Sequence, residues 1–328
     1  MDRHRPLQPF PRGWFCVAYA HEVQRGQVVS RSLAGNDLVV YRTESGRAVA
    51  MDAWCPHMGA HLGRTGARVE GESLRCAFHG FAFDGSGECV ATGYGTKPPA
   101  KARARMWPLR EVNGLLMAYR GGEPDHELPA LDWRGFTPLA WTAKTFELRS
   151  HPQTTTENSV DIGHLAWVHG YESVDVLRPL ATDGPLLTAS YAMSRPAGVV
   201  GKLGSNLRAE FDVAAYGLGY SFVDVRVPAH NLHSRHFVLA TPTDAGRLEL
   251  RLALAIERDG PTRRVPKPLR GAVERAVATA VFRGYVKDAK ADFPMWENTR
   301  HTHPPVLARG DGPIIPFRTW AAQFYDEL

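Results

Sequence analysis

Cys55-Pro-His57-Met58-Gly59-Ala60 and Cys76-Ala77-Phe78-His79-Gly80, with eighteen residues between His57 and Cys76, decide the fold of the first part of this chain. Each stretch carries one cysteine and one histidine, and both are metal-ligand types. A zinc site uses the same ligands, but a zinc finger places its two cysteines together and its two histidines together. The mixed pairs therefore favour a two-iron, two-sulfur centre, in which both thiolates hold one iron and both imidazoles hold the other.

The residues that flank these ligands resemble the ligand loops of Rieske iron–sulfur domains. After His79, Phe81-Ala82-Phe83-Asp84-Gly85 alternates and then enters an Asp-Gly turn, which predicts a hairpin over the second loop. High-potential Rieske proteins of respiratory chains carry an extra cysteine in each loop, joined as a disulfide, and these loops have none. The resemblance therefore implies the lower-potential oxygenase or ferredoxin type. Its cluster ligands would be Cys55, His57, Cys76 and His79.

Composition is typical of a soluble globular protein, with 44% hydrophobic and 22% charged residues in a chain of 328, enough for two domains. No apolar run approaches the roughly 18 residues of a membrane span. The apolar stretch 14–20 is interpreted as an edge strand rather than as a signal peptide. Cys16 and Cys89 are interpreted as small apolar residues of a reducing compartment. We therefore expect a cytoplasmic protein.

The net charge of +5 and the pI near 9.1 come mainly from arginine. No basic run with interleaved aromatic residues is present, so no nucleic-acid partner is expected. Two interpretations of the charge stay open. It is either a scattered solvated surface or a basic patch that docks an acidic ferredoxin by electrostatic steering.

The chain divides into two regions by pattern. Short strands punctuated by turns run from residue 13 to about 119, and Gly121-Gly122-Glu123-Pro124-Asp125 has the composition of a linker. We therefore expect domains at 1–122 and 123–328. In the second, alternation from Leu186 to Leu254 predicts a long antiparallel sheet. A four-residue apolar repeat predicts a helix over 268–292, which Pro294 ends or kinks.

The stretch Glu157-Asn-Ser-Val-Asp161-Ile-Gly-His164-Leu-Ala-Trp-Val-His169 is a second candidate metal motif, on a helix expected from His151 to about Gly170. Asp161 and His164 are three residues apart and would share one helix face. His164 and His169 are five apart, so a π-bulge or a helix end between them would let both face one metal. Two histidines and a distant carboxylate form the facial triad of non-haem iron(II) oxygenases, which leaves positions open for dioxygen and substrate.

With both motifs present, the chain resembles the terminal oxygenase component of Rieske non-haem iron oxygenases over nearly its whole length. Within them it resembles most the 3-ketosteroid 9α-hydroxylase and cholesterol 7-desaturase branch. The branch-like features are Pro11-Arg-Gly-Trp14, Trp107-Pro108, Trp133 and the ending Phe317-Arg-Thr-Trp320-Ala-Ala-Gln-Phe324-Tyr325. The resemblance implies an α+β fold: an N-terminal all-β Rieske domain, then a helix-grip (START-like) catalytic domain with a curved antiparallel sheet. Glu157 is a mild departure, because Asn or Asp is frequent at that position.

The resemblance also assigns roles. It implies His164, His169 and a carboxylate four residues before a tryptophan as iron ligands, which selects Asp292 before Trp296. Asp288, one helical turn earlier, is the runner-up. Asp161 would bridge a cluster histidine, which the family suggests is His79, to His164 of a neighbouring subunit in a head-to-tail homotrimer.

The implied cofactors are a Rieske 2Fe–2S cluster and a mononuclear Fe(II), with O₂ as co-substrate. No dinucleotide fingerprint is present, because Gly85-Ser-Gly87 lacks the third glycine and the helix. Electrons must therefore come from NAD(P)H through a separate reductase, with or without a ferredoxin.

The expected function is that of a Rieske-type non-haem iron monooxygenase that hydroxylates or desaturates a bulky, apolar, steroid-like substrate. One alternative is a Rieske oxygenase that hydroxylates or demethylates an aromatic compound or a secondary metabolite. An alternative of another class is a Rieske electron carrier without catalysis.

Two further expectations concern aromatic and histidine side chains. Trp167 is expected to line the pocket or to belong to the core. His230, His233 and His236 are not expected to share a metal, because three-residue spacing on a strand alternates faces.

Overall fold

The structure is a computed structural model that describes residues 6–196, 206–258, 260, 262 and 265–326. Two compact units compose it. The first contains Gly13–Leu131 and Thr241–Ala245, and the second contains Met1–Arg12, Asp132–Ala240 and Gly246–Leu328. Residue 122, the expected domain boundary, lies inside the first unit.

The first unit is built of three antiparallel sheets. Their strand orders are β1-β11-β10, β2-β3-β4-β9 and β5-β6-β7-β8. The strands are β1 (Gly13–Tyr19), β2 (Val28–Leu33), β3 (Asn36–Arg42), β4 (Ala48–Asp52), β5 (Arg68–Glu70), β6 (Ser73–Arg75), β7 (Ala82–Phe83), β8 (Cys89–Ala91), β9 (Met106–Trp107), β10 (Leu109–Val112) and β11 (Leu115–Arg120). A short 3₁₀ helix, η1 (Ala20–Glu22), follows β1. The apolar stretch at 14–20 is thus largely an edge strand, as predicted, and every residue of β1 is buried.

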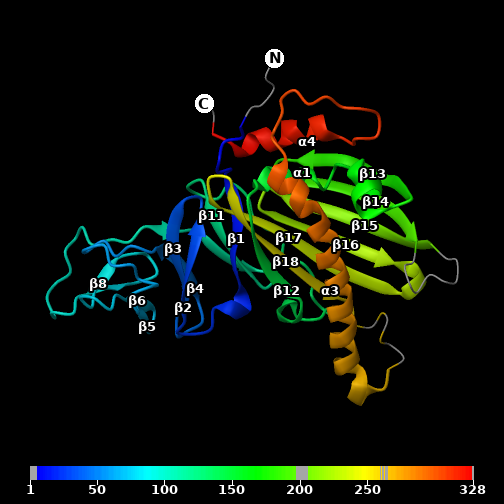
Figure 1. Ribbon diagram of the computed structural model, residues 1–328. Helices are drawn as coiled ribbons and strands as arrows, with labels where there is room; N and C mark the ends of the chain where they lie inside the picture. The colour runs from blue at the N-terminus through cyan, green and yellow to red at the C-terminus, as the bar shows by residue number, and fades with distance from the viewer. Residues whose placement is uncertain (1–5, 197–205, 259, 261, 263–264, 327–328) are drawn as a thin grey trace. The chain divides into compact units, whose positions relative to one another are not determined.

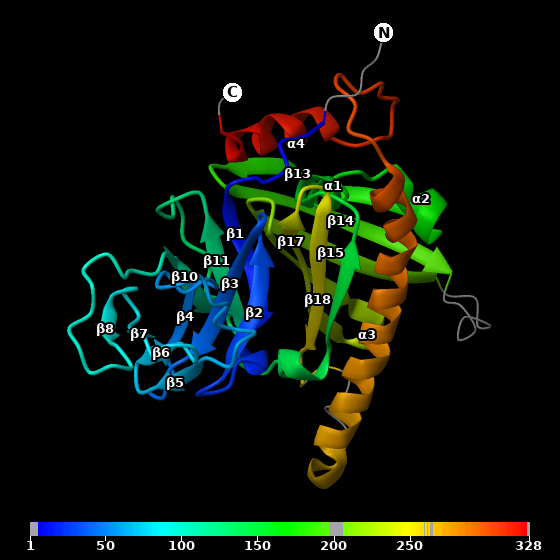
Figure 2. The ribbon, with the colours of Figure 1, turned by 60° about the vertical axis from the view of Figure 1, so that its left-hand side comes forward.

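The second unit is dominated by one seven-stranded sheet in the order β12-β18-β17-β16-β15-β14-β13. The strands are β12 (Ala143–Leu148), β13 (Ser173–Asp183), β14 (Leu186–Pro196), β15 (Asn206–Tyr216), β16 (Tyr220–Val227), β17 (Leu232–Asp244) and β18 (Arg247–Ile256). The helices are α1 (Pro152–Glu157), α2 (His164–His169), α3 (Lys267–Asn298) and α4 (Ile314–Ala321), with 3₁₀ helices η2 (Leu139–Trp141), η4 (Pro228–His230) and η5 (Ala322–Phe324). Figures 1 and 2 show α3 running along one face of this sheet. The predicted long antiparallel sheet and α+β class are confirmed.

The two faces of the sheet differ in chemistry. The face toward α3 carries mostly apolar side chains, for example Met193, Phe211 and Val225. Residues of opposite parity on the same strands carry charges. His233 and His236 show the alternation directly, because His236 lines the α3 side while His233 pairs with Asp224 and Glu257 on the other side.

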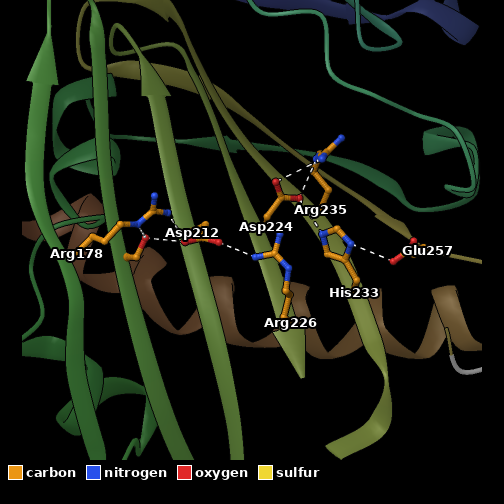
Figure 3. Close-up of polar contacts among 8 residues, drawn as sticks. Arg178, Asp212, Asp224, Arg226, His233, Arg235 and Glu257 are labelled. Carbon is orange, nitrogen blue, oxygen red and sulfur yellow. Dashed lines mark hydrogen bonds and ion pairs between the residues drawn. The ribbon is translucent and has the colours of Figure 1, made fainter. Parts of the chain in front are cut away.

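Figure 3 shows a ladder of charged side chains on this face, whose labelled residues belong to β13, β15, β16 and β17 and to Glu257, which follows β18. Arg178 and Arg226 both pair with Asp212 at 2.6 Å. Next to them, Asp224 accepts from Arg235 at 2.9 Å. Arg235 is almost fully buried and also lies over the rings of Trp133 and Phe136. The ladder therefore ties neighbouring strands together from the side opposite α3.

Two helical expectations need correction, and one helix was missed. The helix expected over 151–170 is two short helices, α1 and α2, and Asp161 lies in the segment between them. Pro294 does not end α3, which continues to Asn298. The short helix α4 was not predicted, because it has only eight residues, too few for its apolar Ile314, Phe317 and Trp320 to show a clear period. Within the described part of the chain, no helix combines the length and apolar character that a bilayer span requires.

Candidate metal centres and substrate cavity

The two Cys/His loops of the first unit have the same backbone design. The amide of Cys55 donates to Ala60 O at 2.8 Å and the amide of Cys76 donates to Phe81 O at 2.8 Å. In each loop, a glycine four residues after the cysteine donates back to the cysteine carbonyl, and both glycines have positive φ, +72° at Gly59 and +66° at Gly80. Glycine adopts this conformation without steric cost. Two matched turns therefore present the four predicted ligands.

The ligand side chains separate by burial. Cys55 and Cys76 are 3% and 2% exposed and belong to an apolar core with Phe81 and Phe83. His57 and His79 are half-buried, and their ring centroids lie 4.7 Å apart. Burial, with the neighbouring Cys76 thiol, raises the pKa of Cys55 to about 11. Two adjacent buried thiols need a bound metal to lose their protons, so the donor set fits a cluster with sulfur ligands inside and imidazoles outside.

The predicted hairpin after His79 is present as β7 and β8, joined through a turn in which Asp84 Oδ1 accepts from the amides of Ser86 and Glu88. The returning strand leads to Gly93, whose amide donates to His79 O at 3.0 Å. A Cβ on Gly93 would lie 2.5 Å from that oxygen. The second ligand loop is therefore closed by direct backbone contact.

The second unit brings together His164 and His169 of α2 and Asp292 of α3. Their ligand atoms all lie within 4.8 Å of one another. His169 Nε2 is 3.0 Å from Asp292 Oδ1, and His164 Nε2 is 3.9 Å from the same oxygen. All three side chains are mostly buried, at 8–13% exposed. Two neutral imidazoles and one carboxylate on one side of a cavity fit a divalent iron with open positions. Asp288 lies one turn earlier and lines the same cavity.

Asp161 contacts His164 on the side away from Asp292. Its Oδ1 accepts from the backbone amide of His164 at 3.3 Å and lies 3.7 Å from His164 Nδ1. That nitrogen is buried and has no hydrogen-bond partner among the described residues. Burial opposes ionisation of both groups, but their mutual attraction outweighs it, lowering the pKa of Asp161 and raising that of His164. The carboxylate is thus placed to accept a hydrogen bond from the Nδ1–H of His164 and to orient the ring.

Glu157 does not face the metal ligands. It ends α1 and forms a two-pronged ion pair with Arg318 of α4, at 2.7 and 2.8 Å. The next residue, Asn158, is the one that reaches the site, with Nδ2 3.2 Å from His164 Nε2 and 3.4 Å from Asp292 Oδ2. Sequence reasoning missed Arg318, because 161 residues separate it from Glu157. The only signal was the departure at Glu157, a carboxylate that needed a cation.

Residues before and within α4 pack against the segment between α1 and α2 and hold it in place. Val160 is fully buried against Ile314 and Phe317. A Cβ on Gly312 would lie 2.2 Å from Val160 O, and one on Gly163 would lie 3.1 Å from Gly310 O. Together with the Glu157–Arg318 pair, these close contacts fix the backbone that carries Asn158 and Asp161.

A cavity of about 440 Å³ lies between the sheet and α3, beside His164, His169 and Asp292. This is within the range of roughly 300–1,000 Å³ for small-molecule sites. No lysine or arginine is among the residues that line it within the described part of the chain. Trp167 does not contribute, contrary to expectation, because its side chain is 90% exposed. The cavity therefore suits an uncharged, apolar molecule.

Solved structures share this fold. The structure titled Pseudomonas putida CBB5 NdmA with caffeine superposes with a TM-score of 0.71 at 18% identity, covering 94% of this chain and 89% of that one. Dicamba monooxygenase bound to dicamba superposes with a TM-score of 0.63 at 18% identity, covering 95% and 96%. Fold, cluster loops and His-His-Asp site together define a Rieske non-haem iron oxygenase, with a 2Fe–2S cluster and a mononuclear iron.

The sequence places it further. Residues 13–102 match the Rieske [2Fe-2S] domain, and residues 117–325 match the family described as 3-Ketosteroid 9alpha-hydroxylase C-terminal domain, to which this chain belongs. A probable 3-ketosteroid-9-alpha-monooxygenase oxygenase component of Rhodococcus rhodochrous is 28% identical, covering all of this chain and 83% of the relative. Cholesterol 7-desaturase of Bombyx mori is 30% identical, covering 97% and 70%.

Proposed function

We propose that this protein is the oxygenase component of a monooxygenase system that hydroxylates or desaturates an uncharged, steroid-like substrate. The observation that carries the proposal is the large cavity beside the His164–His169–Asp292 site, which no lysine or arginine lines within the described residues. A carboxylate substrate there would be desolvated beside Asp288 and Asp292 without a lysine or arginine side chain to pair with, which is unfavourable. The relatives named for 3-ketosteroids and cholesterol support the same substrate class.

We assign the residues as follows. Cys55, His57, Cys76 and His79 hold the cluster, and His164, His169 and Asp292 hold the mononuclear iron. When bound, the cluster supplies single electrons and the iron supplies the positions at which O₂ is activated. The chain's own part is to hold the ring proton of His164 at Nδ1, toward Asp161, so that Nε2 is free to bind the iron, to hold Asp292 by burial, and to place the substrate's carbons against the site. The apolar wall limits water around the reacting carbon.

We further propose that electrons pass through Asp161 between subunits of a homotrimer, from His79 of one chain to His164 of the next. The name "oxygenase component" of the relatives supports a separate reductase, which draws on NAD(P)H with or without a ferredoxin. We place the protein in the cytoplasm. Sedimentation analysis of the iron-loaded protein tests the trimer, and a monomer would contradict the inter-subunit route.

The experiment for the substrate class is a single turnover. Chemically reduced protein is mixed anaerobically with sterols, 3-ketosteroids and, separately, aromatic acids, then given O₂ and analysed by mass spectrometry. A steroid product one oxygen atom heavier shows hydroxylation, and one two hydrogen atoms lighter shows desaturation. Product from the aromatic acids alone would support the alternative substrate class. An iron content of about two per chain, rather than about three, would support the electron-carrier alternative.

A further inference from the structure

The sheet wall of the cavity is interrupted by two polar side chains on β17, Ser234 and His236. Around them, β17 itself contributes the apolar Val238, and strands β16 and β15 contribute Val225 and Phe211. A polar pair in an apolar wall is costly unless its hydrogen bonds are satisfied. The hydrogen bonds of this pair therefore indicate what the wall binds.

One side of the His236 ring is satisfied by the protein. Ser234 Oγ lies 2.8 Å from His236 Nε2. The ring packs against Tyr285 of α3 with centroids 4.5 Å apart, but the Tyr285 hydroxyl donates to Phe237 O at 2.8 Å. His236 Nδ1 has no protein hydrogen bond within the described part of the chain, and the ring is half-buried because it borders the cavity. A ligand in the cavity is thus the available partner.

The imidazole is neutral at physiological pH. Burial lowers the pKa of His236 to about 3, although the negative charge of Asp224 acts in the opposite direction. A neutral imidazole donates from one ring nitrogen and accepts at the other, and the Ser234 hydroxyl can serve either tautomer. The pair can therefore donate to a ketone oxygen or accept from a hydroxyl, but it brings no charge to neutralise an ionic group.

The position of the pair relative to the iron ligands follows from α3. Tyr285, beside His236, and Asp292 are seven residues apart on the cavity face of that helix, which corresponds to about 10 Å, or two turns. A rigid molecule that reaches His236 with a terminal oxygen would present carbons one or two rings away to the site at Asp292. Steroids carry an oxygen at one end of a rigid apolar ring system.

We propose that His236, oriented by Ser234, is a specificity-determining residue that binds a single uncharged terminal oxygen of the substrate, a ketone or a hydroxyl, and so sets which ring carbon faces the iron. This inference rests on the proposed steroid-like substrate. It goes further by naming the group that is recognised and the residue that recognises it.

The test compares binding of three cyclodextrin-solubilised probes to the iron-loaded protein: cholest-4-en-3-one, cholesterol and cholestane, which lacks the oxygen. Binding is followed by the intrinsic tryptophan fluorescence of the protein, to which Trp296 contributes from the cavity wall. The variant is His236→Leu, the conservative rescue is His236→Gln, and the matched control is Val225→Ala, an apolar residue of the same wall. Iron content and the cluster spectrum are measured for each.

We expect the wild-type protein to bind the two oxygenated probes about tenfold more tightly than cholestane, the size of one net hydrogen bond. His236→Leu should lose this preference, and His236→Gln should restore part of it. Val225→Ala should weaken the binding of all three probes alike. An unchanged preference in a folded, iron-loaded His236→Leu protein would overturn the proposed role of His236 alone. Failure of the wild-type protein to bind any of the three probes would overturn both the proposed role of His236 and the proposal of a steroid-like substrate.

Discussion

The two metal centres differ in how their ligands are assembled. All four proposed cluster ligands lie between Cys55 and His79, on two turns of matched hydrogen bonding that are closed by neighbouring backbone. The proposed iron ligands come from a short helix, α2, and from α3, whose Asp292 is far away in the sequence. A centre on local turns depends on a few backbone bonds, whereas a centre between distant helices depends on the packing of a whole unit. A substitution that removes the metal from one centre should therefore leave the metal of the other centre in place.

The largest expected effect comes from Asp292→Ala. Loss of the carboxylate should remove the mononuclear iron and abolish turnover, because two imidazoles alone hold Fe(II) weakly. The cluster, held in the other unit, should keep its visible spectrum. Iron analysis and spectroscopy of the purified protein measure both. Asp288→Ala is the matched control, one turn away on the same helix, and should retain iron; iron loss in that variant instead would make Asp288 the ligand.

Asp161→Asn changes the side chain that contacts His164 and leaves His164, a proposed iron ligand, unchanged. Both metals should remain, while substrate turnover falls by about 100-fold, because the uncharged amide is a weaker hydrogen-bond acceptor for Nδ1–H than the carboxylate. Rapid-mixing measurement of cluster oxidation in the presence of substrate checks this. Turnover at the wild-type rate would rule out Asp161 as the bridge.

Arg318→Gln tests the Glu157–Arg318 ion pair, which holds the α1–α2 segment against α4. It should lower the free energy of unfolding by about 1–3 kcal/mol, because Glu157 loses two charge-assisted hydrogen bonds in a mostly buried position. The double variant Glu157→Gln/Arg318→Gln should recover part of the loss, since no unpaired charge remains. Arg226→Gln, at the partly exposed Arg226–Asp212 pair of the ladder, is the control and should lower the free energy of unfolding by less than about 1 kcal/mol. Denaturant unfolding measures all four proteins, and equal losses for Arg318→Gln and Arg226→Gln would argue against this role of the ion pair.

Histidine burial predicts a pH dependence of the second unit. Burial lowers the pKa of His236 to about 3 and that of His151 to about 4. Below the ordinary value near 6.5, the unfolded chain binds protons that the folded chain does not, so stability falls as pH decreases. Between pH 7 and pH 5, each of the two histidines should lower the free energy of unfolding by about 2 kcal/mol.

The matched comparison is His236→Gln against wild type, because all other titrations then cancel. Ser234, Tyr285 and the more distant charge of Asp224 are the polar groups that act on this ring. The variant should lose about 2 kcal/mol less than the wild type between the two pH values in denaturant unfolding. Parallel stability curves would mean that folding leaves the pKa of the His236 ring unchanged.

Residues close in sequence were predictable because short-range geometry controls them. The Cys/His loops, the hairpin after His79 and the opposite faces of His233 and His236 all follow from turn chemistry or from the two-residue period of a strand. The two histidines of α2 were found by their spacing. The segment before them was misread as helix, because Asp161-Ile-Gly163 leaves the helix where the backbone packs against Gly310 and Gly312.

What only the tertiary structure decided depends on contacts between distant segments. Family resemblance pointed to Asp292, but its place beside His164 and His169 comes from how α3 packs on the sheet, which is the sum of many apolar contacts. Glu157 needed Arg318, 161 residues away, and His236 gained its meaning from the cavity around it. The sequence by itself determined the ligand types and their local turns. The pairing of distant charges and the wall of the cavity required the packed chain, because no local period encodes them.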